Sequence, residues 1–159
     1  MAQIGFGQSV TVNSPTDDVS WNVFGGSLTI AAGAQFPSQT IINVFMGGKL
    51  AITGGTVNAS SRISVAQQST ATISGGEMNA GVMIAQSSKV TLSGGVIKEV
   101  QAWYLVQEST LTVEGSGLVL DDSNPFVWKV TGTLQDGNAL TLVLQVASNQ
   151  NVHVVLQNG

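Results

Sequence analysis

The chain has 159 residues, of which 43% are hydrophobic and only 9% are charged, with a formal net charge of −4. Ordinary soluble proteins carry roughly 25% charged residues, so Ser, Thr, Asn and Gln must supply most of the surface polarity. The five basic residues form no cluster, which argues against nucleic-acid and acidic-membrane partners, and the lack of cysteine excludes disulfides and thiolate metal sites.

Residues 1–20 are predicted to form an N-terminal arm. Residues 8–12 alternate polar and apolar side chains as a short strand does, and the stretch 13–18, with Pro15, predicts a turn. The arm has neither the basic nor the apolar region of a secretory signal. No apolar run of the chain reaches the ~18 residues that a transmembrane helix requires. We expect the arm to cap the first coil or to reach a neighbouring molecule.

Residues 21–129 form the predicted repeat body. A motif such as Leu-Thr-Ile at 28–30, followed by glycine, recurs about every 21 residues. A period of this length indicates a solenoid, whose coils bury their apolar side chains only against the coils above and below. Three short strands per coil, joined by Gly and Ser corners, predict an all-β, single-stranded, right-handed parallel β-helix of about five to six coils.

Two further sequence motifs complete each predicted coil. The second contains Phe36, Val57, Met78, Ile97 and Leu118, and the third occupies 42–44, 63–65, 82–84, 103–105 and 124–126. Alternate residues of a strand face the same side, which defines the inward set. The predicted core is Leu28, Ile30, Leu50, Ile52, Ile73, Val90, Leu92, Leu111 and Val113, with Val44, Val65, Ile84 and Leu105 from the third motif.

Residues 130–159 break the repeat. A strand-like segment at 131–134, a turn at Asp136-Gly137, a strand at 140–144 and another at 152–156 predict a β-rich C-terminal segment. The end of a solenoid exposes unpaired backbone and apolar side chains, so it requires a cap. We expect this segment to serve as the cap and as an oligomerisation contact.

The strings GKLAITGGTVN at 48–58 and STATISGGEMN at 69–79 resemble repeats of AIDA-like autotransporter passenger domains. They also resemble the short β-helices of bacteriophage surface proteins, both tail spikes and capsid decoration proteins. The resemblance covers residues 21–129 and implies the β-helix fold. Because the chain is expected to lack a signal peptide and a membrane barrel and to have few coils, the viral comparison is favoured. That comparison implies synthesis in the host cytoplasm and assembly as an oligomer, often a trimer.

We therefore expect a non-enzymatic structural protein of the virion surface, an oligomeric capsid decoration (cement) protein that stabilises a phage shell. Its expected partners are further copies of itself, with a homotrimer favoured, and the major capsid protein or another virion protein. The alternative is a carbohydrate-binding or adhesive solenoid of the tail-spike or passenger type, located outside the cell or on its surface, with a glycan as partner. No cofactor is expected.

Four aromatic residues are the candidate interface or binding residues: Trp21, Trp103, Tyr104 and Trp128. Aromatic side chains anchor both subunit contacts and sugar rings, and the scarcity of charge favours the subunit contact. Strand alternation predicts that Trp103 points inward and that Tyr104 points outward.

No catalytic or metal-binding residue is assigned. A polysaccharide-cleaving enzyme would need two facing carboxylates, for which Asp121 with Asp122, or Glu77 with Glu99, are the candidates. Solvated corner acids are the preferred interpretation of both pairs. The only histidine, His153, is expected to be an exposed strand residue. One histidine and no cysteine argue against a zinc site.

Three stacks of polar side chains are predicted along the solenoid axis. Amide ladders at Gln67, Gln86 and Gln107 and at Asn58 and Asn79 are expected to stabilise successive coils. The third is an outward row whose threonines suggest ice binding as a less favoured function, although two lysines and an alanine interrupt it. Its members are Thr29, Ala51, Thr72, Thr91 and Thr112, flanked by Ser27, Lys49, Thr70, Lys89 and Thr110.

Overall fold

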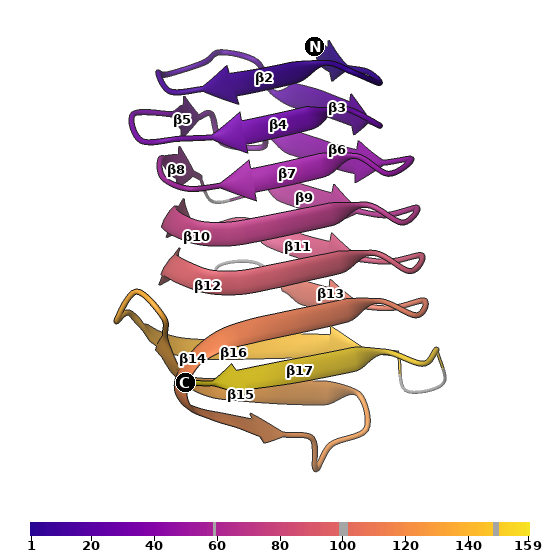
Figure 1. Cartoon of the computed structure of the whole chain (residues 1–159), viewed down its shortest axis with the longest axis vertical. Helices are drawn as coiled ribbons and strands as arrows, with labels where there is room; N and C mark the ends of the chain where they lie inside the picture. The colour runs from indigo at the N-terminus through magenta and orange to yellow at the C-terminus, as the bar shows by residue number, and fades with distance from the viewer. Residues whose placement is uncertain (59, 99–101, 148–149) are drawn as a thin grey trace.

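The structure is a computed structural model that describes residues 1–58, 60–98, 102–147 and 150–159. All its strands join one continuous sheet that winds through about five turns of a parallel β-solenoid (Figure 1). The predicted all-β parallel β-helix is therefore confirmed. The described residues contain no helix, and so none that could cross a membrane.

The strands of the coils form three faces, and equivalent strands of successive coils pair in parallel. The first face, toward the viewer in Figure 1, comprises β2 (Ser9–Val12), β4 (Ser27–Ile30), β7 (Lys49–Ile52), β10 (Thr70–Met78), β12 (Lys89–Ile97), β14 (Thr110–Asp121) and β17 (His153–Asn158). The second contains β5 (Gln35–Phe36), β8 (Thr56–Val57) and the ends of β10 and β12. The third comprises β1 (Ala2–Ile4), β3 (Ser20–Phe24), β6 (Ile41–Phe45), β9 (Arg62–Val65), β11 (Gly81–Ile84), β13 (Trp103–Leu105) and β16 (Ala139–Val146).

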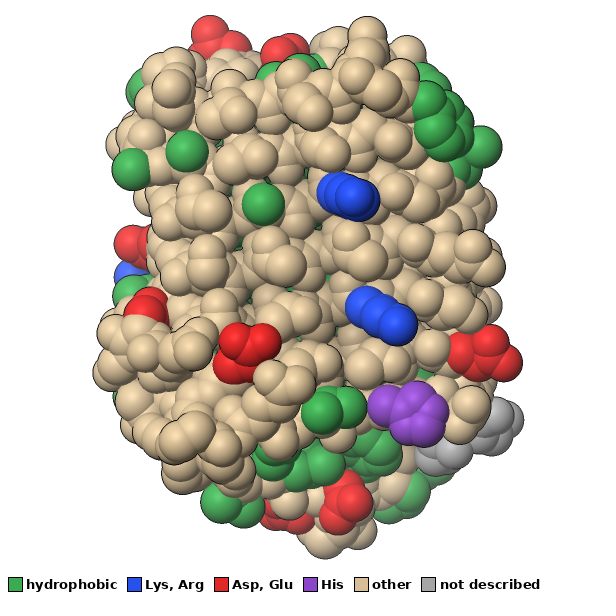
Figure 2. All heavy atoms as spheres, viewed as in Figure 1, with side chains coloured by type: hydrophobic (Ala, Val, Ile, Leu, Met, Phe, Trp, Pro, Cys, Tyr) green, Lys and Arg blue, Asp and Glu red, His purple; other side chains and the backbone are tan. Residues whose placement is uncertain are grey.

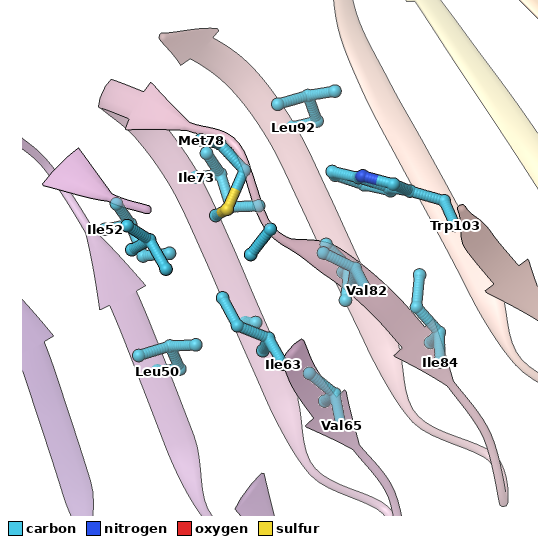
Figure 3. Packing of buried hydrophobic residues seen from close by; sticks show 14 of the residues in the cluster. Leu50, Ile52, Ile63, Val65, Ile73, Met78, Val82, Ile84, Leu92 and Trp103 are labelled. Carbon is cyan, nitrogen blue, oxygen red and sulfur yellow. The ribbon is translucent and has the colours of Figure 1, made fainter. Parts of the chain in front are cut away.

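The inward residues of the repeat motifs stack from coil to coil in linear files. Ile30 pairs with Ile52, Ile52 with Ile73, and Ile73 with Leu92. Every predicted core residue is at most 3% exposed. Figure 3 shows these files meeting side chains of the other faces, such as Met78 and Trp103, in one hydrophobic core. Burial of this kind stabilises a fold by about 25 cal/mol per Å² of apolar surface.

One coil is shorter than the others, and the difference lies at a single corner. Five residues separate Val57 from Ile63, whereas three separate Met78 from Val82. Val57 still pairs with Met78, and Ile63 with Val82, so the strands on both sides keep their register. The 19-residue step from Ile73 to Leu92 therefore reflects a shortened corner between the second and third faces.

The corner between the third and first faces is a column of tight turns. Each turn has two consecutive residues with positive φ, which is typical of a type I′ turn; the pairs are Met46-Gly47, Gln67-Gln68, Gln86-Ser87 and Gln107-Glu108. The amide of Gln68 donates to the carbonyl of Gln86 at 3.0 Å, and Ser87 donates equally to Gln107. The predicted glutamines therefore lie on successive coils, and main-chain hydrogen bonds link their turns along the axis.

The asparagine stacks differ in detail from the predicted ladder. The side-chain amide of Asn58 donates to the carbonyl of Phe36 at 2.7 Å, and that of Asn79 donates to Glu77. A direct amide-to-amide contact instead joins Asn43 to Asn22, at 3.0 Å on the outer side of the third face.

The prediction of a third-face strand at 124–126 is wrong. These residues lie in an exposed loop between β14 and β15 (Val127–Leu134), and Leu144–Val146 of β16 pairs with β13 instead. The local chemistry explains the loop. Pro125 has no N–H to donate, and the Asn124 side chain accepts hydrogen bonds from the amides of Phe126 and Val127.

The two ends of the chain both join the solenoid. Strands β1 and β2 of the predicted arm pair with β3 and β4, so residues 1–20 supply the first rungs. At the other end, β14 continues into an antiparallel meander with β15 and β16, after which β17 pairs with β14 on the first face. The predicted boundary at residue 20 coincides with the start of β3, whereas that at 129–130 falls inside β15.

The Asp136 carboxylate closes a corner that no further coil covers. It accepts a hydrogen bond from the Gly95 amide at 2.6 Å and two from Asn138. Burial raises the pKa of the Asp136 carboxyl, but these hydrogen bonds outweigh it and hold the pKa below its ordinary value. The turn between β15 and β16 thereby caps the glycine corner of β12.

Gly47 and Gly76 both have positive φ, but only Gly76 is packed closely against a neighbouring coil. A Cβ on Gly76 would lie 2.8 Å from the Gly54 carbonyl of the preceding coil, whereas a Cβ on Gly47 would meet nothing within 4 Å. We expect Gly47→Ala to lower the free energy of unfolding by about 1 kcal/mol, because alanine is strained at positive φ. Gly76→Ala should cost about 1–3 kcal/mol more, because the coils must move apart. Urea unfolding followed by tryptophan fluorescence measures both, and equal costs would contradict the close contact.

The Asp136 cap predicts a pH-dependent contribution to stability. Because the folded pKa lies below the unfolded one, the stabilisation is present above the unfolded pKa of about 3.9 and is lost as the pH falls through the folded value. We expect Asp136→Asn to lower the urea midpoint at pH 7 and the difference to shrink toward pH 3. Asp122→Asn, at an exposed residue, is the charge-matched control. A loss for Asp136→Asn that is independent of pH would contradict the role of the carboxylate.

Candidate functional site

Two of the four predicted aromatic residues lie in the core. Trp21 is 5% exposed, packs edge-to-face on Phe36 with 5.7 Å between ring centroids, and donates its indole N–H to the Asp18 carbonyl. Trp103 is 1% exposed, and among the residues that the structure describes its indole N–H has no hydrogen-bond partner. Neither ring presents a surface to a partner molecule.

Tyr104 and Trp128 reach the surface at separate places. Tyr104 is 42% exposed on the outer side of the third face, so the alternation predicted for Trp103 and Tyr104 is confirmed. Trp128 is half-buried on β15 of the antiparallel meander, where it packs against the core. The four residues do not form one aromatic platform.

Tyr104 borders a groove at the corner between the second and third faces. The corner groove, defined here by Gln39, Ile41, Ser60, Arg62, Met83 and Tyr104, encloses about 460 Å³. Gly81 lies at its base, paired with Arg62 of the neighbouring coil. The shortened corner, residues 79–81, ends at Gly81. The loss of two corner residues and the lack of a side chain at Gly81 together open the groove.

An aromatic column that the repeat pattern did not predict lies at the final ends of the third-face strands, opposite the corner groove. The aromatic column comprises Phe6, Phe24, Phe45 and Met46, in which Phe6 is 64% and Met46 50% exposed. Ring centroids are 6.4 Å apart for Phe6 and Phe24 and 5.9 Å for Phe24 and Phe45. The hydrophobic patch at the upper right of Figure 2 lies over the turns that follow β3 and β6. The 21-residue spacing of Phe24 and Phe45 was the available signal.

The candidate carboxylates engage local partners. Hydrogen bonds from Asn79 and Lys98, with the charge of Lys98, hold the pKa of the Glu77 carboxyl below its ordinary value. Hydrogen bonds from Ser123 lower the pKa of Asp121 in the same way. Neither carboxyl therefore has the raised pKa that a general acid requires. Glu99, the expected neighbour of Glu77, lies outside the described residues.

His153 lies exposed on β17 and pairs in register with Thr110 of β14. No group of three or more His, Cys, Asp or Glu side chains within the described ranges could hold a metal ion.

The outward threonine row stacks in the predicted register on the first face. Thr29 pairs with Ala51, Ala51 with Thr72, and Thr72 with Thr91. Lys49 and Lys89 are exposed beside the row, and Figure 2 shows two isolated basic side chains on this otherwise polar face. The lysines interrupt the flat hydroxyl array that ice binding would need.

Comparison of the chain with protein-family models, curated proteins and solved structures found no match.

The burial of Trp103 and the exposure of Tyr104 predict opposite effects on stability. Trp103→Ala should cost about 3–5 kcal/mol, because it leaves a large cavity between coils. Tyr104→Ala should change stability by no more than about 0.5–1 kcal/mol. Urea unfolding followed by circular dichroism measures both variants, with Trp103→Phe as the milder core change. Similar losses for Trp103→Ala and Tyr104→Ala would contradict this placement of the two rings.

Proposed function

We propose that this protein is a non-enzymatic structural protein that assembles as an oligomer and decorates a protein shell such as a phage capsid. The aromatic column is the observation that carries the proposal. Monomeric soluble proteins rarely expose contiguous apolar surface of this kind, and such patches mark contacts with other proteins. Here three phenylalanine rings and a methionine lie together at one corner.

The direction of the column favours copies of the same chain around a shared axis. Phe6, Phe24 and Phe45 belong to successive coils, so the column runs parallel to the solenoid axis. A rotation axis in the same direction lets every copy bury its column against its neighbours, which produces a closed ring. A homotrimer is the form we propose.

The composition of the surface supports decoration of a larger assembly. With 9% charged residues, the outer faces carry little of the charge that keeps proteins apart in solution. An oligomer also presents each weak contact several times to a repetitive shell, which raises the overall affinity without new contacts. The partner would be the major capsid protein or another protein of the virion surface.

A carbohydrate-binding or adhesive role is the second candidate function. The exposed Tyr104 ring beside the corner groove favours it.

The oligomeric state tests the assembly. Light scattering at about 50 µM should give a mass three times that of the 16.4 kDa chain, since interfaces with buried aromatic anchors commonly reach micromolar affinity. The double variant Phe6→Ser/Phe45→Ser should give monomers with an unchanged circular dichroism spectrum. Val96→Ser, at an exposed apolar residue of the second face, should stay trimeric. A wild-type chain that is monomeric at this concentration would contradict the proposal.

A further inference from the structure

The corner groove has the dimensions of a small-molecule site. Its volume of about 460 Å³ lies within the range of roughly 300–1,000 Å³ that ligand pockets span. Paired strands supply part of its lining, because Ile41, Arg62 and Met83 belong to neighbouring strands of the third-face ladder. The groove lies at the ends of these strands opposite the aromatic column, so it is a separate surface.

Arg62 gives the groove a positive charge. It is the only arginine of the chain, and among the described residues it is the only charged one that lines the groove. Among the described residues its guanidinium makes no ion pair; the ion pairs there join Met1 to Asp18 and Lys98 to Glu77. A guanidinium is planar and presents paired N–H donors, a geometry that matches a carboxylate.

Tyr104 and Met83 give the groove an apolar wall. They are partners on adjacent rungs, and Arg62 stands one rung beyond Met83 and two residues back along the strand direction. With rungs ~4.8 Å apart and ~3.3 Å per residue, the Cα atoms of Arg62 and Tyr104 are roughly 12 Å apart. That span leaves room for one sugar ring between a guanidinium and an aromatic face.

The rim of the groove provides polar groups for hydroxyls. Gln39 and Ser60 are exposed, and within the described part of the chain neither side chain makes a hydrogen bond. Both have positive φ, 65° and 64°, in the turns that precede β6 and β9. An amide and a hydroxyl can each donate and accept, as sugar hydroxyls require.

We propose that the corner groove binds a carboxylated sugar residue of an acidic glycan. Arg62 pairs with the carboxylate, the apolar face of the sugar packs on Tyr104 and Met83, and Gln39 and Ser60 bind its hydroxyls. The groove opens on the outer side of the sheet, so a longer glycan can continue beyond the bound residue. This function is additional to assembly through the aromatic column, because Arg62 stands at the opposite ends of the third-face strands.

The probe is a trimer of galacturonic acid, titrated calorimetrically at low salt, with its fully methyl-esterified form as the neutral counterpart. We expect a Kd of about 1 mM or lower for the acid and at least tenfold weaker binding of the ester. Arg62→Gln should abolish the preference for the acid. Tyr104→Ser should weaken binding of both forms about tenfold, because it removes the stacking surface. Lys89→Gln, which removes one positive charge from the first face, is the matched control and should bind as the wild type does.

Three results would overturn the proposal. The first is no heat of binding for the acid up to about 10 mM. The second is equal affinity for acid and ester, and the third is an equal loss in Lys89→Gln and Arg62→Gln, which would indicate unspecific attraction to positive charge. Circular dichroism checks that each variant is folded. The titration is independent of the oligomeric state, so its failure leaves the proposed assembly standing.

Discussion

The parallel hydrogen-bond ladder between coils is the constraint on which the rest of this structure depends. It holds each strand ~4.8 Å from its equivalent in the next coil, so each inward side chain lies directly over another. An apolar residue such as Ile52 then remains dry only because Ile30 and Ile73 cover it from both sides. No coil is stable alone, and stability arises from contacts between neighbours.

Because the ladder fixes the strands, variation is confined to the corners, and the corners differ in what they tolerate. The glycine corner brings backbone against backbone, so Gly76 has no room for a side chain. The turn corner points its side chains into solvent and accepts Met, Gln, Ser and Glu despite positive φ. The corner after Met78 has lost two residues without disturbing the pairing of Val82 on either side. Length changes there alter the surface and leave the core intact.

The repeat body was predictable from the sequence because the residues within each period indicate which side chains face inward. Each coil repeats the same alternation, so the inward files, including Leu28 and Leu105, followed from spacing alone. The tail was not predictable in the same way, since Phe126 follows Leu105 at the 21-residue period and yet Leu144–Val146 is the segment that pairs with β13. That choice depends on the long-range meander. The local signal that excluded 124–126 was the turn chemistry of Asn124 and Pro125.

The candidate site was predictable only in part, for a related reason. Alternation placed Tyr104 outward, but the groove beside it arises from four successive coils whose corners differ in length, which no single repeat reveals. The column likewise needs Phe6, whose position follows from the turn in which the Gln8 side chain accepts a hydrogen bond from Gly5. Surfaces made by several coils require the stacking to be known before their members can be grouped.

The parallel arrangement of the third-face strands also keeps the corner groove apart from the aromatic column. All third-face strands run in one direction, so their starting ends lie on one side of the solenoid and their final ends on the other. Arg62 stands at a starting end, whereas Phe24 and Phe45 stand at final ends. Copies that pack through the aromatic column would therefore hold their grooves on the far ends of the same strands, away from the shared axis. Such an arrangement would leave each groove open to solvent in the assembled oligomer.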